Sequence, residues 1–295
     1  MTEPGATAAS VFTTHHSTTH HSATHHVEIS GDRVVKTFTS WDRGEHRREW
    51  RGLSLLHEYA PGLGPAPISA DLEAQPPSIV MSRVPGEPLG TRRMTPEQTD
   101  ALAAALDRMH GAVPADALAE ADPQDTPSSI DSLLRRMLAA CAAPTEDGGA
   151  KPVVREAFEA ARRVIESSGW VERGARLGDP RPVFGMNDGN LANFLWDAET
   201  GGVRVIDFES AGRNDRAFEL ADLAEHISLW LGAQTDADDV LACLELTAAE
   251  RARIRLYRPA FAALWLLRLL PDGGSSRRNP PGTLEAQAAR LLDLV

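Results

Sequence analysis

The amino-acid sequence predicts an α+β fold built from two lobes, a small β-rich lobe and a larger, mostly helical one. Short β-branched runs are concentrated in residues 1–84, together with one long helical pattern. Residues 85–295 consist mainly of alanine- and leucine-rich stretches, interrupted by a second β-rich region from Pro182 to Asp207. With 295 residues, 42% of them hydrophobic, the chain can bury the core of one or two domains.

The small lobe is predicted to contain a β-hairpin followed by a helix. Residues 27–29 and 34–38 are β-branched runs, and the Ser-Gly-Asp sequence at 30–32 between them is a turn signal. From Arg43 to Tyr59 large apolar residues recur at three-residue steps, which indicates a helix. A further short strand is expected over residues 78–84, where a Pro-Gly pair follows it.

A stretch made almost entirely of threonine, histidine and serine precedes the hairpin, from Thr13 to His26. Its three His-His pairs recur every five residues, a spacing that matches neither a strand nor a helix. Because imidazole binds zinc, copper and nickel, a metal site is one interpretation of the stretch. A polar turn flanked by strands is the interpretation that we favour.

The larger lobe is predicted to be helical on both sides of its β-rich region. Thr95 occupies an N-cap position, with Pro96 in the first turn of a helix that runs to about His110. Further helices are expected over residues 130–141, 153–168 and from 218 onward, apart from a loop at 271–282.

Composition narrows the possible partners and the compartment. The formal net charge of −12 argues against a nucleic-acid partner and suits a cationic ligand, although ordinary acidic solubility explains it more simply. Cys141 and Cys243 have neither metal-ligand spacing nor a disulfide pattern. No apolar run reaches the roughly 20 residues of a membrane span, and the N-terminus lacks a secretory pattern. We therefore expect a cytoplasmic protein without a membrane partner.

The residues that carry chemistry are concentrated in the β-rich region of the larger lobe. Asp188 and Asn193 lie five positions apart in a tight loop, and Asp207 follows an apolar strand at 203–206. Phosphoryl transfer requires an aspartate that orients the attacking hydroxyl and accepts its proton, and Asp188 suits that role. It also requires hard oxygen ligands for Mg²⁺, which Asn193 and Asp207 offer.

Two residues of the small lobe support this interpretation. Lys36 lies on a predicted strand and Glu49 on the helix that follows. In kinases a strand lysine contacts the α- and β-phosphates, and a helix glutamate holds that lysine in place. Taken singly, Lys36 could be a solvated edge lysine and Glu49 an exposed helix residue. In order with the three residues of the larger lobe, they favour a kinase.

These motifs resemble those of the aminoglycoside phosphotransferase and choline kinase superfamily, over nearly the whole chain. The resemblance is carried by Asn187-Asp188 with Asn193, by the Ile-Asp-Phe-Glu sequence at 206–209, and by residues 215–221. The first two look closer to the choline and ethanolamine kinase branch. The resemblance implies a bilobal protein-kinase-like fold, with a nucleotide-binding lobe at 1–84 and a catalytic and acceptor-binding lobe at 85–295. It also implies Mg²⁺ and ATP as cofactors, with GTP as an alternative.

The same resemblance assigns further residues. The segment Arg83–Leu89 looks like the linker between the lobes, where the nucleotide base docks, so backbone groups of Ser82 and Val84 are expected to bind the base. Glu219 and Asp222 would brace the catalytic region or face the substrate cleft. Alternatively, both are helix N-terminal carboxylates favoured by the helix dipole.

The sequence departs from the superfamily pattern at two places. Met186 stands where the family usually has a histidine, two residues before the catalytic aspartate, and a methionine there can preserve the packing. No glycine-rich loop precedes Lys36, and Ser17 to Thr24 occupy that place. Hydroxyl and backbone N–H groups of this segment would then contact the phosphates.

The C-terminal helices are predicted to build a site for a small-molecule hydroxyl acceptor. An acidic or aromatic site would suit a cationic amine. Candidate lining residues are Glu225, His226, Trp230, Tyr257 and Trp265, the last of which is more simply a core residue. Two alternatives stay open, a kinase of peptide serine or threonine and a regulatory pseudokinase. The sequence does not identify the acceptor, the nucleotide or the oligomeric state.

Overall fold

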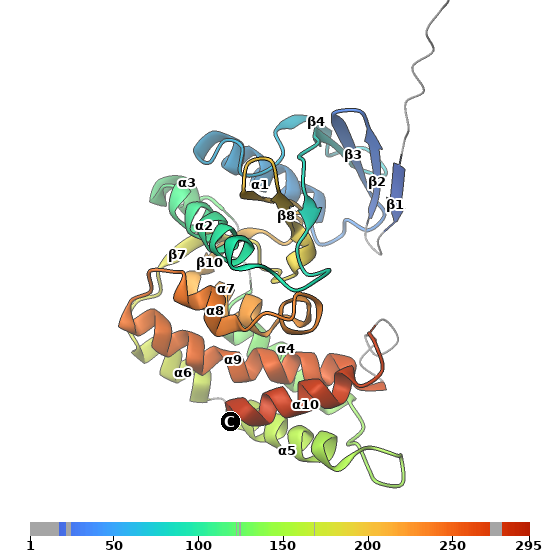
Figure 1. Cartoon of the computed structure of the whole chain (residues 1–295), viewed down its shortest axis with the longest axis vertical. Helices are drawn as coiled ribbons and strands as arrows, with labels where there is room; N and C mark the ends of the chain where they lie inside the picture. Colours follow the sequence, from blue (N-terminus) through green and yellow to red (C-terminus); the bar gives the residue numbers. More distant parts are fainter. Residues whose placement is uncertain (1–17, 22–24, 122, 124, 168, 272–278) are drawn as a thin grey trace, which may run out of the picture.

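The computed structural model describes residues 18–21, 25–121, 123, 125–167, 169–271 and 279–295. An antiparallel sheet and helix α1 form one end of the molecule, and the helices of the second half of the chain form the other (Figure 1). The predicted α+β fold, with an N-terminal sheet followed by a mostly helical region, is confirmed.

The N-terminal sheet has five strands in the order β1-β2-β3-β5-β4, all antiparallel to their neighbours. The predicted hairpin is present, because Ser30 pairs with Arg33 across a two-residue turn in which Gly31 has a φ of 59°. The strands are β1 (Thr18–His21), β2 (His25–Ser30), β3 (Arg33–Phe38), β4 (Pro67–Asp71) and β5 (Ser78–Ser82).

Two details of this sheet differ from the sequence prediction. The threonine- and histidine-rich stretch is not simply a turn, because Thr18–His21 form edge strand β1 in register with residues 26–29 of β2. Ser17 and residues 22–24, part of the proposed phosphate-contacting segment, lie outside the described residues. Strand β4 was not predicted, since its alternation is weak and its first residue is Pro67.

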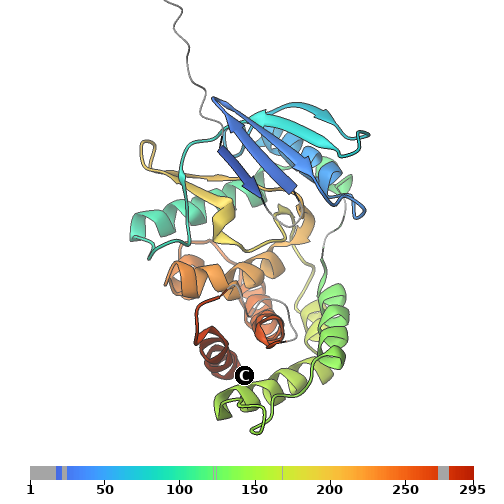
Figure 2. The same ribbon diagram turned by 90° about the vertical axis from the view of Figure 1, so that its right-hand side faces the viewer.

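Helix α1 (Glu45–Tyr59) packs between the sheet and the start of the helical region (Figure 2). The contact depends on Gly52, because a Cβ atom there would lie 2.7 Å from Cβ of Phe208. Phe208 is fully buried and directly follows Asp207. The glycine therefore lets α1, which carries Glu49, approach the segment that carries Asp207.

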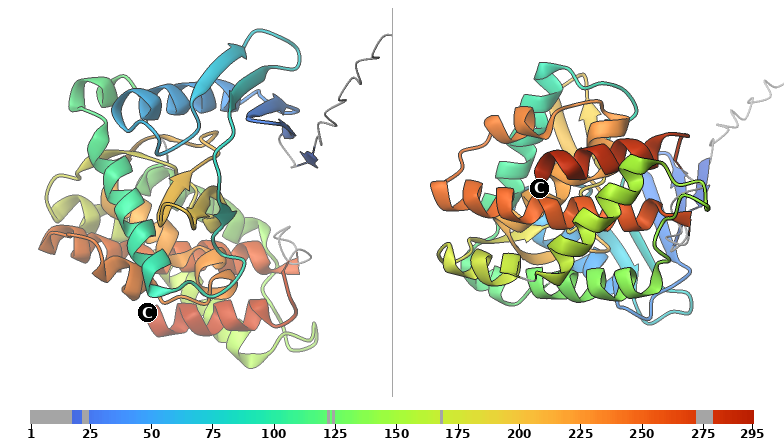
Figure 3. Two further views of the ribbon diagram at one scale, coloured as in Figure 1. Left: turned by 45° about the horizontal axis from the view of Figure 1, so that its top comes forward. Right: turned by 90° about the horizontal axis from the view of Figure 1, so that it is seen from below.

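The helical region contains the predicted helices, with boundaries within a few residues of those expected. Thr95 caps α2 with a full capping box, in which its side chain and that of Gln98 bond each other's backbone N–H groups. The helices are α2 (Pro96–Ala112), α3 (Ala115–Ala119), α4 (Pro127–Ala140), α5 (Pro152–Glu166), α6 (Gly169–Arg176), α7 (Arg216–Glu225), α8 (Ala237–Ala242), α9 (Ala248–Leu269) and α10 (Thr283–Leu294). Helices α5, α9 and α10 pack together at the end far from the sheet (Figure 3).

Two small antiparallel sheets lie between the N-terminal sheet and these helices. One pairs β7 (Pro182–Gly185) with β10 (Gly212–Asp215), and the other has the order β6-β8-β9. The strands of the second are β6 (Glu87–Pro88), β8 (Phe194–Asp197) and β9 (Gly202–Val205). Strand β10 was not predicted, because its sequence, Gly-Arg-Asn-Asp, has no apolar side chain and so no strand-like alternation. The lobe boundary between residues 84 and 85 remains our proposal.

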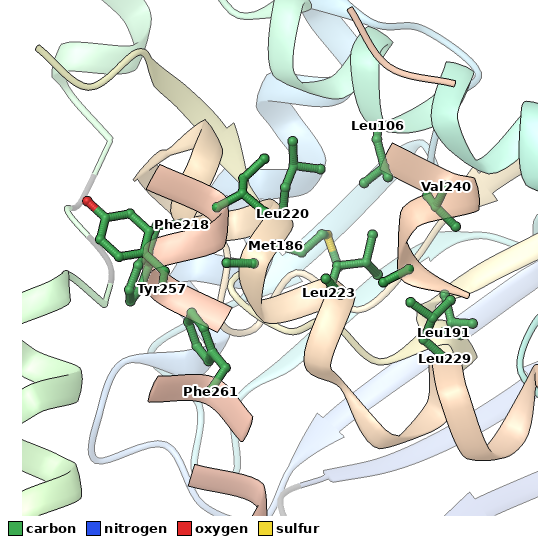
Figure 4. Packing of buried hydrophobic residues seen from close by; sticks show 14 of the residues in the cluster. Leu106, Met186, Leu191, Phe218, Leu220, Leu223, Leu229, Val240, Tyr257 and Phe261 are labelled. Carbon is green, nitrogen blue, oxygen red and sulfur yellow. The ribbon is translucent and has the colours of Figure 1, made fainter. Parts of the chain in front are cut away.

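A continuous hydrophobic core runs from α1 to α10 and includes Met186. The Met186 side chain is fully buried and lies near Leu220 and Leu223 of α7 (Figure 4). The methionine thus fills a core position at the start of the loop that carries Asp188. Among the described residues, no helix is long and apolar enough to cross a membrane.

The Gly52 contact gives a stability prediction. Replacing Gly52 with alanine should push α1 away from Phe208 and lower the free energy of unfolding by about 1–3 kcal/mol. The matched control is Gly111→Ala in α2, where a Cβ atom meets nothing within 4 Å and should stabilise the helix by up to about 1 kcal/mol. Denaturant unfolding of both variants checks this, and equal effects would contradict the packing account.

Candidate active site

Lys36 is the centre of a buried cluster of charges. Its side chain is only 4% exposed, and its Nζ lies 2.8 Å from Oε2 of Glu49 on α1. The same ammonium contacts Asp207 directly and lies 3.3 Å from Oε2 of Glu209. Residues separated by up to about 170 positions in the chain therefore meet at one atom.

The fold explains why these groups meet. Strand β3 is paired on both sides, with Val27 and Ile79 opposite Lys36, so this residue is not a solvated edge lysine. Glu49 is 1% exposed and points from α1 toward the sheet, so it is not an exposed helix residue. Asp207 follows β9 with a φ of 70°, a left-handed conformation that is uncommon outside glycine.

The charges in this cluster do not balance. Burial alone would lower the pKa of Lys36, but the carboxylates of Glu49, Asp207 and Glu209 together raise it above its ordinary value. Lys36 is therefore charged, and three carboxylates facing one ammonium leave an excess of two negative charges. That excess suits a divalent cation.

Glu209 and His25 extend the cluster and were not predicted as site residues. Nδ1 of His25 on β2 lies 3.1 Å from Oε2 of Glu209, so the N-terminal sheet contacts the segment after β9 a second time. Burial would raise the pKa of Glu209, but the hydrogen bond with His25 and the charge of Lys36 lower it to about 2. Glu209 was visible in the Asp-Phe-Glu sequence, and His25 belongs to the threonine- and histidine-rich stretch, for which a metal site was the less favoured interpretation.

Asp188 lies in a loop that is closed by hydrogen bonds to its own carboxylate. Oδ1 accepts from the backbone N–H of Asn190 at 3.1 Å, and Oδ2 accepts from Nδ2 of Asn193 at 3.0 Å. The carbonyl of Asn193 in turn accepts from the backbone N–H of Ile206 at 2.9 Å. The structure therefore brings Asp188 and Asn193 next to the segment that leads to Asp207.

Burial raises the pKa of Asp188, and the charge of Asp207 adds to this increase. Hydrogen bonds from Asn190 and Asn193 oppose the effect because they stabilise the ionised form. A carboxylate with a raised pKa is a stronger base than an ordinary aspartate.

Glu219 and Asp222 hold the Asp188 loop from α7. Glu219 accepts from the backbone N–H groups of Met186 at 2.5 Å and Asn187 at 3.1 Å, and from Nδ2 of Asn214 at 2.8 Å. Oδ2 of Asp222 accepts from the N–H of Gly189 at 3.0 Å. These contacts favour the bracing interpretation over carboxylates that merely stabilise a helix end.

A cavity of about 340 Å³ opens beside Asp188. Its lining combines carboxylates, an amide, an imidazole and guanidinium groups, with buried aromatic residues behind them. The polar and charged lining residues are Arg43, Asp125, Asn187, Asp188, Ser210, Asp222, His226 and Arg268. We call it the Asp188 cavity.

Of the predicted acceptor-site residues, only His226 lines the Asp188 cavity. Glu225 is fully buried and pairs with Arg258 and Arg290, each at 2.6 Å, so it joins helices rather than facing a ligand. Tyr257 packs edge-on against Phe218 in the core. The other two are also packing residues, because Trp230 and Trp265 belong to a small hydrophobic cluster beside α9.

The contacts of His226 fix which ring nitrogen carries the proton. Nδ1 accepts from the N–H of Ser228 at 3.2 Å and lies 2.7 Å from its hydroxyl. Burial, and then the charge of Arg268, lower the pKa of His226 to about 3, so the ring is neutral. Nε2 therefore carries the hydrogen, and it lies 3.9 Å from Oδ1 of Asp188.

The two residues proposed to bind the nucleotide base, Ser82 and Val84, differ in whether their polar groups are already hydrogen-bonded within the protein. Ser82 ends β5, and its N–H already donates to the carbonyl of Ala66 at 2.9 Å, while its hydroxyl accepts from the N–H of Ala66. Val84 follows the strand and is partly exposed. The geometry therefore favours Val84 over the Ser82 amide for contact with a base.

The donor set beside Lys36 fits a magnesium ion. Because Nδ2 of Asn193 donates to Asp188, the amide oxygen of Asn193 points away from that carboxylate and remains an acceptor. Asp207 is 27% exposed in its side chain, and ligand atoms of His25, Asp207 and Glu209 lie within 4.8 Å of one another. Carboxylate and amide oxygens are ligands that Mg²⁺ prefers.

An N-terminal sheet whose lysine pairs with a glutamate of α1, above a loop that carries an aspartate and an asparagine, is the arrangement of a kinase-like phosphotransferase. Comparison of the chain with models of protein families leads to the same class of protein. The model of the APH phosphotransferase enzyme family matches residues 22–272, so the chain belongs to this family of nucleotide-dependent small-molecule phosphotransferases. No curated protein sequence matches the chain significantly.

Solved structures of related fold cover almost the whole chain. A choline/ethanolamine kinase family protein from Mesorhizobium loti is 17% identical with a TM-score of 0.64, over 95% of this chain and 88% of its own. Spectinomycin phosphotransferase APH(9)-Ia is 12% identical with a TM-score of 0.61, over 95% and 94% of the two chains. APH(2")-IIia is 14% identical with a TM-score of 0.63, over 96% and 93%. At these identities the likeness shows the fold.

The contacts of Asp222 give a prediction for pH dependence. Its burial, followed by the neighbouring carboxylates Asp188 and Glu219, raises the pKa of Asp222 to about 7. Between the ordinary aspartate pKa and that value, the folded chain retains a proton that the unfolded chain has lost. The free energy of unfolding therefore falls as the pH rises through this interval.

Replacing Asp222 with asparagine removes this titration and leaves an oxygen for the N–H of Gly189. Between about pH 4.5 and pH 7.5, the free energy of unfolding of Asp222→Asn should fall less than that of the wild type. The exposed Asp147→Asn is the control and should keep the wild-type slope. Denaturant unfolding across this range measures the slopes, and a wild-type slope in Asp222→Asn would refute the assignment.

Proposed function

We propose that the chain transfers the γ-phosphate of ATP or GTP to a hydroxyl group of a small molecule, with Mg²⁺ as cofactor. The observation that carries this proposal is the meeting of Lys36, Glu49 and Asp207 beside the Asp188–Asn193 loop. These are the five groups that phosphoryl transfer requires, and each lies within bonding distance of another member of the set.

Each group has a distinct task in the proposed reaction. Lys36, held by Glu49, would bind the α- and β-phosphates, which requires its ammonium to turn from Asp207 toward the nucleotide. Asp188 would accept the proton of the acceptor hydroxyl as the oxygen attacks. Val84 at the linker would bind the base.

Asn193 and Asp207 would hold Mg²⁺, with Glu209 close enough to assist. When bound, Mg²⁺ offsets the negative charge of the phosphate oxygens during transfer. The two negative charges in excess around Lys36 support a divalent cation at this place.

The names of related structures support a nucleotide and a small acceptor. APH(9)-Ia was solved with ADP and spectinomycin, and APH(2")-IIia with GDP and kanamycin. We infer that this chain accepts ATP or GTP. The Asp188 cavity, about 340 Å³ in volume, suits a small acceptor better than a peptide segment. The buried packing of Met186 gives no support to a pseudokinase.

The test is a transfer assay with Mg²⁺ and ATP or GTP, offered with aminoglycosides, amino alcohols, sugars, hydroxy acids and peptides. Asp188→Asn should lower kcat by about 10²–10⁴-fold, because it removes the general base, and should leave nucleotide affinity unchanged. The exposed Asp147→Asn is the matched control and should retain wild-type turnover.

Each other outcome of the assay has a defined meaning. Transfer to a peptide alone would replace the small-molecule proposal by a peptide kinase. Nucleotide binding without transfer or hydrolysis would favour a regulatory pseudokinase. Full turnover in Asp188→Asn would exclude Asp188 as the base.

A second prediction concerns the metal. Asp207→Asn removes one of the proposed metal-binding carboxylates, so half-saturation by Mg²⁺ should move to a higher concentration in both the transfer assay and calorimetric nucleotide binding. Excess chelator should abolish transfer by the wild type. An unchanged Mg²⁺ dependence in Asp207→Asn would rule this residue out as a ligand.

A further inference from the structure

The charged residues that line the Asp188 cavity differ in whether they have partners. Arg43 pairs with Glu45, at 2.7 Å from NH2 and 2.8 Å from Nε. Asp125 accepts hydrogen bonds from Asn187 and Ser129. Asp188 and Asp222 accept the bonds that close and brace the catalytic loop. Their charges are therefore at least partly satisfied within the protein.

Arg268, near the C-terminal end of α9, is different, because its charge acts on the carboxylates of Asp188 and Asp222 without direct contact. Within the part of the chain that the structure describes, its guanidinium makes no hydrogen bond and has no carboxylate within 4.0 Å. The group is half-buried and lies over the ring of Trp265, at 5.1 Å from the ring centroid. The aromatic surface restricts the arginine, which lines the cavity with donors left for a ligand.

A half-buried guanidinium is always charged, and its planar donors match the oxygens of carboxylate or phosphate groups. We propose that the acceptor of this phosphotransferase carries an anionic group, a carboxylate in the simplest case, which Arg268 binds. The inference rests on the proposed function and names the class of acceptor, a hydroxy acid. It differs from the cationic amine that an acidic or aromatic acceptor site would suit.

The same cavity has a place for the hydroxyl beside His226 and Asp188. Nε2 of His226, which carries the hydrogen, lies 3.9 Å from Oδ1 of Asp188. One oxygen atom can lie within hydrogen-bond distance of both, accepting from His226 and donating to Asp188. His226 would thus orient the hydroxyl, while Arg268 holds the acid group.

The reaction balances without a further reagent. The acceptor oxygen forms a bond to the γ-phosphorus as the bond between that phosphorus and the β–γ bridging oxygen breaks. The hydroxyl proton passes to Asp188, and the nucleoside diphosphate leaves. Arg268 and His226 take no part in the bond changes.

The aromatic residues of the cavity do not favour a cationic acceptor. Phe218 and Phe261 line it, but they are 1% and 3% exposed and pack against each other with ring centroids 4.8 Å apart. A cation–π site needs an accessible ring face, which these side chains do not offer. Trp265 is covered on one side by Arg268 itself.

Matched acceptor pairs test this proposal in the transfer assay. Each hydroxy acid is compared with its decarboxylated counterpart: L-serine with ethanolamine, L-homoserine with 3-aminopropan-1-ol, and glycerate with ethylene glycol. We expect kcat/KM to be at least about tenfold higher for the acids, since a charge-assisted bond is lost in each counterpart. Arg268→Gln should abolish this preference and leave KM for the nucleotide unchanged.

Arg255→Gln is the matched control, because Arg255 is an exposed arginine of the same helix outside the cavity. It should keep the preference for acids. Equal turnover of acids and counterparts by the wild type would overturn the proposal. So would a preference that survives in Arg268→Gln, or a KM change confined to the nucleotide, which would assign Arg268 to the γ-phosphate.

A binding titration decides the matter if no member of the panel is phosphorylated. Glycolate and ethylene glycol are added separately to the full chain labelled with ¹⁵N-arginine, and the Arg268 Nε–H signal is identified by its loss in Arg268→Gln. A saturable shift with glycolate alone supports the proposal, and its absence overturns it. ADP is titrated in parallel, so that a failure of nucleotide binding is distinguished from a failure of anion binding.

Discussion

The remainder of the site depends on the ion pairs that the buried ammonium of Lys36 makes with three carboxylates. Its three carboxylate neighbours come from α1 and from the segment after β9, so one charge joins the N-terminal sheet to the helical region. Burying a charge is costly unless partners replace its lost hydration. Without the ammonium, the three carboxylates would repel one another. The ion pairs of Lys36 therefore hold the N-terminal sheet and the helical region in the arrangement that the proposed phosphoryl transfer needs.

A second set of contacts fixes the Asp188 loop relative to this cluster. Glu219 and Asp222 hold the loop from α7, and Asn193 bonds both the Asp188 side chain and the backbone of Ile206, next to Asp207. A chain of hydrogen bonds therefore connects the proposed base, Asp188, with the proposed metal ligands, Asn193 and Asp207. A displacement of either segment would disturb both functions at once.

The sequence predicted most of the fold and singled out the five residues that we propose for catalysis and metal binding, because helix periodicity, turn signals and motif spacing are local properties. It did not predict β10, whose polar sequence is a strand only because β7 pairs with it. It did not connect His25 with Glu209, which lies far along the chain, and it did not place Arg268 in one cavity with Asp188. Of the five acceptor-site candidates only His226 lines the Asp188 cavity. Glu225 instead pairs with Arg258 and Arg290, which the sequence does not place beside it.

A double-mutant cycle on nucleotide affinity decides whether Glu49 acts through Lys36. Calorimetry would measure ADP binding with Mg²⁺ to the wild type, Lys36→Met, Glu49→Gln and the double variant. We expect strong coupling, with the double variant binding ADP no more weakly than Lys36→Met alone. Additive losses in the double variant would contradict it, because Glu49 would then contribute to nucleotide binding independently of Lys36.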